Sequence, residues 1–196
     1  LILKEKGINH GTRNICVERW LILSNITKRY SGSSETAFQR DIEMFVQNEN
    51  PVIVIDRIEQ AELSDNFWEV TFVDQLSTSH TPTFYTFVMA QIVNGDNAFL
   101  STEKVTSIVK NVGDKHHVFP KKYLENNGFE QTEYNQIANY AMINKETNII
   151  IGKKAPLHYL KEFENSDKNF EENALPIDLE TMKANDYYKF LDQRRI

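Results

Sequence analysis

The sequence contains a single cysteine, Cys16, among its 196 residues. One thiol excludes an internal disulfide and any zinc site built from two or more thiolates. A lone cysteine is most often a small buried apolar residue, and we expect this of Cys16. Because disulfide-free proteins are typical of reducing compartments, the sequence predicts a cytoplasmic location.

Long apolar runs are also missing, since no stretch approaches the ~20 residues that a membrane-spanning helix needs. We therefore expect no membrane partner. The N-terminal Leu1-Ile2-Leu3 leads directly into Lys4-Glu5-Lys6, which predicts no secretory signal peptide. The first residue is not methionine, so we expect a piece of a longer protein that lacks its N-terminal part.

The chain also lacks an excess of basic residues, because its formal net charge is −6. This speaks against a protein with a basic surface all round. The segment 103–161 nevertheless holds nine lysines and six acidic residues, a local balance of +3 that leaves −9 for the remainder. A locally basic segment in an acidic chain indicates a surface that faces phosphates.

Abundant aromatic residues indicate that the chain can bury a core, and the first half reads as largely helical. Helical spacing of apolar residues runs from Glu18 to Tyr30. After a turn at 31–34, Ser33 or Ser34 can cap a second helix from Glu35 that ends at 48–51. This second helix carries four apolar residues on one face, namely Phe38, Ile42, Phe45 and Val46.

The secondary structure of the later segments is predicted with different clarity. Residues 52–55 and 68–73 are rich in β-branched residues, which leaves strand and helix open. Residues 84–93 predict a buried helix with a capping threonine and Pro82 in its first turn. A helical pattern returns at 187–191, after an acidic run at 162–167.

The stretch that carries chemistry begins at 114–121 and continues at 137–148. It predicts a strand, a long loop, a second short apolar strand and the start of a polar helix. The adjacent His116 and His117 lie in the first part, and Asn139 and Asn148 lie in the second. We expect that these residues can assemble around one metal ion.

Hydrolysis of a phosphodiester needs a general base and a divalent cation that neutralises charge on the phosphate and the leaving oxygen. A neutral histidine suits the base, and an imidazole nitrogen with an asparagine oxygen suits the metal. A further asparagine can lock a hairpin through backbone hydrogen bonds. The residue types alone also allow plainer roles, with the histidine pair accidental and both asparagines in turns or caps.

The stretch resembles the HNH nuclease domain at the C-terminus of GmrSD-type, modification-dependent (type IV) restriction endonucleases. The residues that carry the resemblance are His116, His117, Val118, Phe119, Pro120, Asn139 and Asn148. Residues 152–160 resemble the basic, Pro-x-x-Tyr-Leu ending of that family. Trp20 and the segment 29–41 resemble the helical region before the nuclease, and 190–195 matches a terminal helix weakly.

The resemblance implies a metal-dependent DNA endonuclease that acts in restriction of foreign or modified DNA. His117 would be the general base, Asn139 would hold the hairpin, and His116 and Asn148 would bind the metal. Asp114 is an alternative ligand on the same strand face as His116. Phosphate contacts are expected from Lys121, Lys122, Lys153 and Lys154, although a solvated lysine face is the plainer interpretation of each.

One departure from the family concerns the metal. The position of His116 is often acidic in HNH nucleases, and imidazole is a softer ligand than a carboxylate. We expect Mg²⁺, with Mn²⁺, Ni²⁺ or Zn²⁺ as alternatives. The nucleotide-hydrolysing N-terminal domain of the family is expected to be a partner outside this chain.

Together these observations predict an α+β protein in which helices enclose a ββα-metal hairpin core. The expected divisions are a helical region at 1–100, the nuclease core at 101–161 and an acidic C-terminal helical segment at 162–196. Two other functions stay open: a DNA-binding module without catalysis, which would bind no divalent ion, and a helical protein-interaction domain, which would show no salt-dependent DNA affinity.

Overall fold

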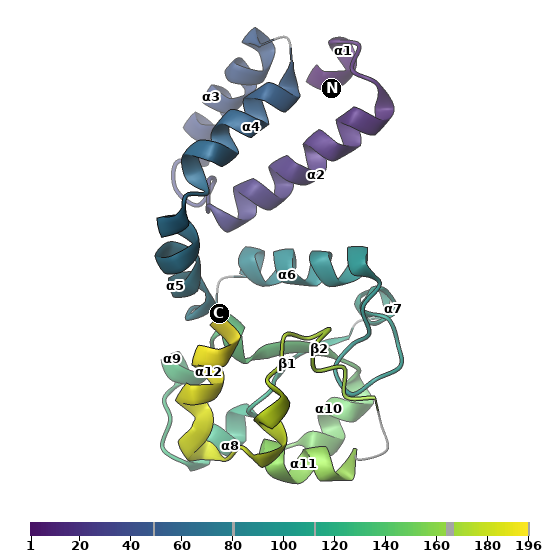
Figure 1. The fold of residues 1–196 in the computed structure, drawn as a ribbon, viewed down its shortest axis with the longest axis vertical. Coiled ribbons are helices and arrows are strands. Elements are labelled where there is room, and N and C mark those ends of the chain that lie inside the picture. The colour runs from purple at the N-terminus through teal and green to yellow at the C-terminus, as the bar shows by residue number, and fades with distance from the viewer. Residues whose placement is uncertain (49, 80, 112, 164–166, 196) are drawn as a thin grey trace. The chain divides into compact units, whose positions relative to one another are not determined.

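The computed structural model describes residues 1–48, 50–79, 81–111, 113–163 and 167–195. The chain divides into two compact units, Leu1–Phe72 (unit 1) and Val73–Ile196 (unit 2). Both are mostly helical, and unit 2 also contains a two-stranded antiparallel sheet, so the predicted mostly helical α+β class is confirmed (Figure 1). Within the described residues, we find no helix with the length and apolar character needed to span a membrane.

Local sequence signals set the helix boundaries of unit 1. Its helices are α1 (Ile2–Glu5), α2 (His10–Ile26), α3 (Ser34–Gln47), α4 (Pro51–Glu62) and the π-helix η1 (Phe67–Phe72). The Asn50 side chain accepts the Val52 N–H and Pro51 lies in the first turn, which is a standard way to begin a helix. Ser33 precedes α3 as expected, but its side chain makes no capping bond. The two ambiguous segments are both helical: 52–55 lies in α4, and 68–73 lies in η1 and the first residue of α5 (Val73–Leu76).

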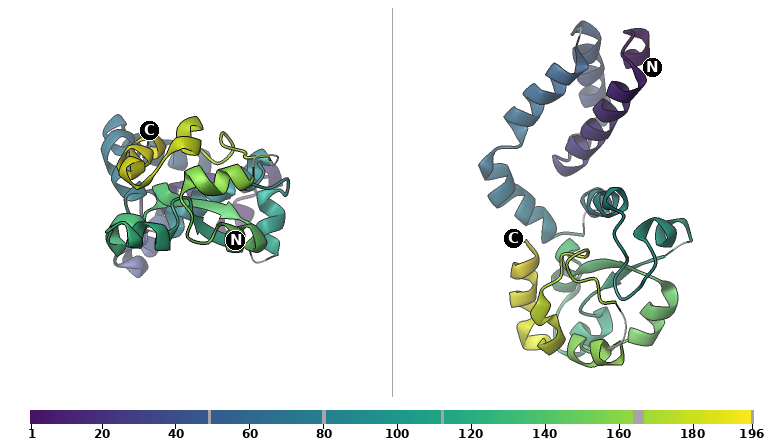
Figure 2. Two further views of the ribbon diagram at one scale, coloured as in Figure 1. Left: turned by 90° about the horizontal axis from the view of Figure 1, so that it is seen from below. Right: turned by 45° about the vertical axis from the view of Figure 1, so that its right-hand side comes forward.

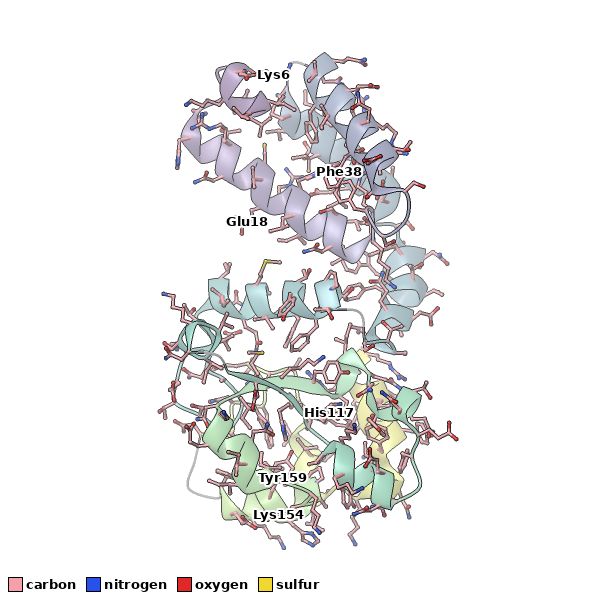
Figure 3. The ribbon with its side chains drawn as sticks, turned by 180° about the vertical axis from the view of Figure 1, so that it is seen from behind. Lys6, Glu18, Phe38, His117, Lys154 and Tyr159 are labelled. Atoms are coloured by element: carbon pink, nitrogen blue, oxygen red, sulfur yellow. The ribbon has the colours of Figure 1, made fainter. Side chains whose placement is uncertain are left out.

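The core of unit 1 lies where α2 and α3 pack against α4 (Figure 2). Its buried residues are Leu23, Val54 and Ile58. Cys16 is also buried, at 2% exposure, as the sequence predicts. On α3, the apolar face divides: Phe45 packs against this core, whereas Phe38, Ile42 and Val46 are exposed (Phe38 is labelled in Figure 3).

A buried ion pair joins the segment that follows α2 to α3. Arg29 Nη2 lies 2.6 Å from Asp41 Oδ1, and the two side chains are 8% and 4% exposed. Burial raises the pKa of Asp41, but hydrogen bonds from Arg29 and Tyr30 outweigh it, so the net pKa is lowered. The Arg29 guanidinium also lies 5.0 Å from the centre of the Trp20 ring. The interior of unit 1 therefore contains two opposite charges that compensate each other and link the segment after α2 to α3.

Unit 2 places a short hairpin among many helices. Its elements are α5 (Val73–Leu76), α6 (Thr81–Asn94), α7 (Val105–Lys110), β1 (Asp114–His117), α8 (Lys121–Asn126), α9 (Gln131–Tyr134), η2 (Ile137–Asn139), β2 (Tyr140–Ile143), α10 (Lys145–Ile151), α11 (Pro156–Glu162), η3 (Ile177–Thr181), η4 (Ala184–Asp186) and α12 (Tyr187–Arg195). The predicted apolar helix 84–93 lies within α6, where Phe84 and Val88 are buried but Tyr85 and Val93 are exposed.

The two strands pair antiparallel, with His116 opposite Ala141 and His117 opposite Tyr140. Successive strand residues point to opposite faces. Tyr140 and Met142 accordingly join a core cluster with α6 and α7, whereas Ala141 and Ile143 join a second cluster with α10, α11 and α12. The strands therefore lie between two helical layers (Figure 1), which explains why β2 is apolar at every position.

The structural division falls at a different place from the expected boundaries at 100 and 161. Helices α6 and α7 pack on the hairpin and lie in the same unit. The C-terminal segment also contributes to the hairpin core, through Leu179, Phe190 and Leu191. Residues 164–166 of the predicted acidic run lie outside the described residues.

Candidate functional site

The site forms where β1 leaves the sheet and α10 begins. The Val118 N–H bonds to the Asn139 carbonyl at 2.8 Å, which extends the pairing of the two chains beyond His117. Asn144 caps α10 by accepting the Thr147 N–H at 2.8 Å. Since α10 packs against β1, Asn148 comes to lie beside the strand in the first turns of this helix.

A cleft of about 300 Å³ collects most of the predicted site residues. Its lining residues are Lys115, His116, His117, Pro120, Lys121, Lys122, Glu125, Asn148 and Gly152. Lys153 and Lys154 do not line it. Lys154 instead pairs with Glu162, and Figure 3 shows it well away from His117. The structure thus joins the histidine pair with Asn148 and two of the four predicted lysines.

His116 and Asn148 contact each other directly. His116 Nδ1 lies 2.7 Å from Asn148 Oδ1, and Asn148 Nδ2 donates to Asp114 Oδ2 at 3.1 Å. Asp114 thereby orients the amide oxygen of Asn148 toward His116, and its role as an alternative metal ligand stays a prediction. Burial lowers the pKa of His116 to about 4, so the ring is neutral near pH 7.

His117 lies on the opposite face of β1 from His116, yet both line the same cleft. Its Nε2 lies 2.9 Å from Asn135 Oδ1, and its ring meets the Tyr140 ring edge-on with centroids 5.0 Å apart. Burial lowers the pKa of His117. The hydrogen bond to Asn135 opposes this, and the charges of Lys115 and Lys121 add to it. The ring is therefore fixed in place and neutral at neutral pH.

Asn139 is fully buried behind the cleft and lines no part of it. Its Oδ1 accepts the Phe119 N–H at 2.8 Å, and its Nδ2 donates to the Phe119 and Tyr134 carbonyls, each at 3.2 Å. These bonds tie the segment after β1 to the segment before β2. The contacts are those that the hairpin-holding role requires, while the effect on catalysis stays a prediction.

The spacing of the two predicted metal ligands can be compared with that in a metal site. Two neighbouring ligands at about 2.1 Å from an octahedral metal lie about 3.0 Å apart. The 2.7 Å between His116 Nδ1 and Asn148 Oδ1 is close to this value, but the contact is a hydrogen bond that Nδ1–H donates to the amide oxygen. A metal held by both atoms would therefore replace the Nδ1 proton. His116 Nε2 is buried without a hydrogen-bond partner in the described chain. The described residues contain no group of three or more His, Cys, Asp or Glu side chains placed to hold a metal.

Three residues in or beside the cleft were not singled out from the sequence: Lys115, Glu125 and Asn135. Lys115 follows the strand alternation that places it on the face of His117, so periodicity could have found it. Glu125 lies on α8 and Asn135 directly follows α9, both in the region between the two strands, where no sequence pattern fixes the path of the backbone. Their contacts with the site depend on tertiary packing.

Comparison with known proteins does not assign the chain to a family. No family model matches the chain, and no solved structure matches it. The chain is 26% identical over 156 residues to an uncharacterized protein of Methanocaldococcus jannaschii. The match covers 78% of this chain and 26% of that protein, so the chain spans about a quarter of the length of this relative.

Proposed function

We propose that this chain is an HNH-type, metal-dependent DNA endonuclease. The observation that carries the proposal is the single cleft that unites His117 with the His116–Asn148 pair. The order of β1, β2 and α10 agrees with the two strands and helix that the HNH resemblance implies, with α8, α9 and η2 in the place of the long loop expected between the strands. The hydrogen bonds of the Asn139 side chain also support the proposal, because they reach Phe119 after β1 and Tyr134 before β2.

In this mechanism His117 accepts a proton from the attacking water. Its lowered pKa keeps it neutral at working pH, and Asn135 and Tyr140 hold the ring in place. His116 and Asn148 would hold the metal, and Asp114 would keep the Asn148 amide oriented through the hydrogen bond it accepts from Nδ2. A divalent metal, when bound, supplies positive charge that stabilises the phosphate and the leaving oxygen.

The identity of the metal follows from the donor set. An asparagine oxygen suits Mg²⁺, whereas the imidazole of His116 suits Mn²⁺, Ni²⁺ or Zn²⁺ better than a carboxylate would. We propose Mg²⁺ as the physiological ion, with activity also in Mn²⁺ or Ni²⁺. A comparison of cleavage rates across these ions measures the preference directly.

The biological setting is part of the proposal. We propose that the nuclease acts in restriction of foreign or modified DNA, in the cytoplasm, together with a nucleotide-hydrolysing N-terminal domain outside this chain. The relative from Methanocaldococcus jannaschii is much longer than the matched region, which is in keeping with a module inside a larger protein. Cleavage of modified and unmodified DNA by the longer protein, with and without nucleotide, tests this setting.

The experiment that tests the chemistry is His117→Ala against His158→Ala. Loss of a general base lowers the cleavage rate by about 10²–10⁴-fold. His158 is an exposed histidine of α11 outside the cleft, so its substitution should leave the rate unchanged. Equal rates for the two variants would move the base away from His117. A chain that binds DNA but no divalent ion would instead be a non-catalytic binding module.

A further inference from the structure

Lys115 is the one lysine of the cleft for which no ion pair is found in the described part of the chain. It lies on β1 between Asp114 and His116, and its side chain is exposed. Strand alternation places it on the same face as His117, two residues further along. An unpaired ammonium at the rim of a cleft is free to bind an anion without first breaking a salt bridge.

An aromatic ring holds this ammonium beside the proposed base. Lys115 Nζ lies 4.1 Å from the centre of the Tyr140 ring and 6.0 Å from that of Phe84. His117 meets the same Tyr140 ring edge-on. Because the cation is attracted to the ring face, the flexible lysine is positioned before any ligand arrives. Tyr140 thus fixes Lys115 and His117 as neighbours.

The other two lysines of the cleft, Lys121 and Lys122, each lie close to a carboxylate. Lys122 Nζ lies 3.1 Å from Glu125 Oε2, and Lys121 Nζ lies 3.8 Å from Glu125 Oε1. One carboxylate therefore offsets part of the charge of both. A phosphate that binds Lys121 or Lys122 must compete with Glu125, whereas one that binds Lys115 meets no such competitor in the described residues.

We propose that Lys115 is the main phosphate-binding cation of the cleft and holds a DNA backbone phosphate beside His117. This rests on the proposed function, because it specifies how that site holds its substrate. It assigns to Lys115 a role that sequence patterns gave to Lys121, Lys122, Lys153 and Lys154. Lys115 binds the phosphate as a point charge, so the contact carries no information on base sequence.

The test is the salt dependence of binding to a duplex DNA oligonucleotide in EDTA, which prevents cleavage. Each phosphate contact contributes about 0.9 to the slope of log affinity against log salt. Lys115→Gln should therefore lower the slope by about 0.9 and weaken binding about 8-fold at 0.1 M salt. Lys115→Arg should keep the slope, since the charge is retained. Lys161→Gln, on α11 and outside the cleft, is the matched control.

The outcomes separate this inference from the proposed function. If wild type binds DNA and Lys115→Gln keeps the full slope, the assignment of Lys115 is wrong and the nuclease proposal stands. An equal loss in Lys161→Gln would likewise overturn it, because the effect would reflect net charge. If wild type shows the Lys115-dependent slope but cleaves no DNA with any divalent metal, the phosphate contact stands and the nuclease proposal fails.

Discussion

Asn139→Ala should destabilise unit 2 strongly although the residue touches no part of the cleft. The side chain is fully buried and makes three hydrogen bonds to the backbone of Phe119 and Tyr134. Its loss leaves one N–H and two carbonyls unsatisfied in the interior. Each such group costs about 1–3 kcal/mol before the structure relaxes, so we expect unit 2 to lose about 3 kcal/mol in free energy of unfolding.

The assay must report on unit 2 alone. Both tryptophans, Trp20 and Trp68, lie in unit 1, so tryptophan fluorescence follows only that unit. Amide hydrogen exchange of peptides within 114–163 in a urea series measures unit 2. Asn127→Ala is the matched control, because Asn127 is exposed and donates one hydrogen bond, to the Tyr123 carbonyl. We expect its cost to stay within about 0.5 kcal/mol.

Two results would refute this reasoning. Equal protection in Asn139→Ala and Asn127→Ala would mean that the buried amide does not hold the hairpin. If the free energy of unfolding of unit 1, detected by tryptophan fluorescence, fell together with that of unit 2, the substitution would act on the whole chain. We expect unit 1 to be unchanged.

Three further predictions follow from the site and from unit 1. Asn148→Ala should weaken metal affinity and be partly rescued by excess divalent ion, and rates that do not rise with added metal would leave Asn148 only a structural role. Burial lowers the pKa of His117, and that of His116 to about 4. Both rings therefore stay neutral to lower pH than free imidazole does. The single-turnover cleavage rate, measured against pH, should fall only below about pH 6.5. A fall centred above that pH would contradict the prediction. Arg29→Met leaves the Asp41 carboxylate buried without its main partner, so tryptophan-detected urea unfolding should show a loss of about 3–5 kcal/mol, and a loss under about 1 kcal/mol would contradict the buried pair.

Local signals predicted much of the helical framework. Asn50 and Pro51 mark the end of α3 and the start of α4 because a side-chain cap and a fixed φ act within a few residues. The β-branched residues of 68–73 left strand and helix open, and the structure forms η1 and the start of α5 there, with Trp68 and Val70 exposed. The exposure of Phe38 and Ile42 could not be predicted, because spacing indicates a face but not what covers it.

The sequence motif identified the residues of the candidate site that belong to it. It did not identify residues that reach the site only through the tertiary fold. His116 and Asn148 are 32 positions apart, yet the motif paired them and the structure places them in contact. Asn135 reaches His117 from a loop whose path depends on many distant contacts. Strand alternation alone places Lys115 on the face of His117, but its contact with the Tyr140 ring of the other strand is known only from the structure.

We propose that this cleft hydrolyses phosphodiester bonds with a divalent metal. The most direct measurement is cleavage of plasmid DNA by wild type, His117→Ala and His158→Ala over a series of Mg²⁺, Mn²⁺ and Ni²⁺ concentrations. We predict cleavage by wild type and His158→Ala that EDTA abolishes, and a rate about 10²–10⁴-fold lower for His117→Ala. Cleavage that is equal in all three proteins, or absent with every metal, would contradict the claim.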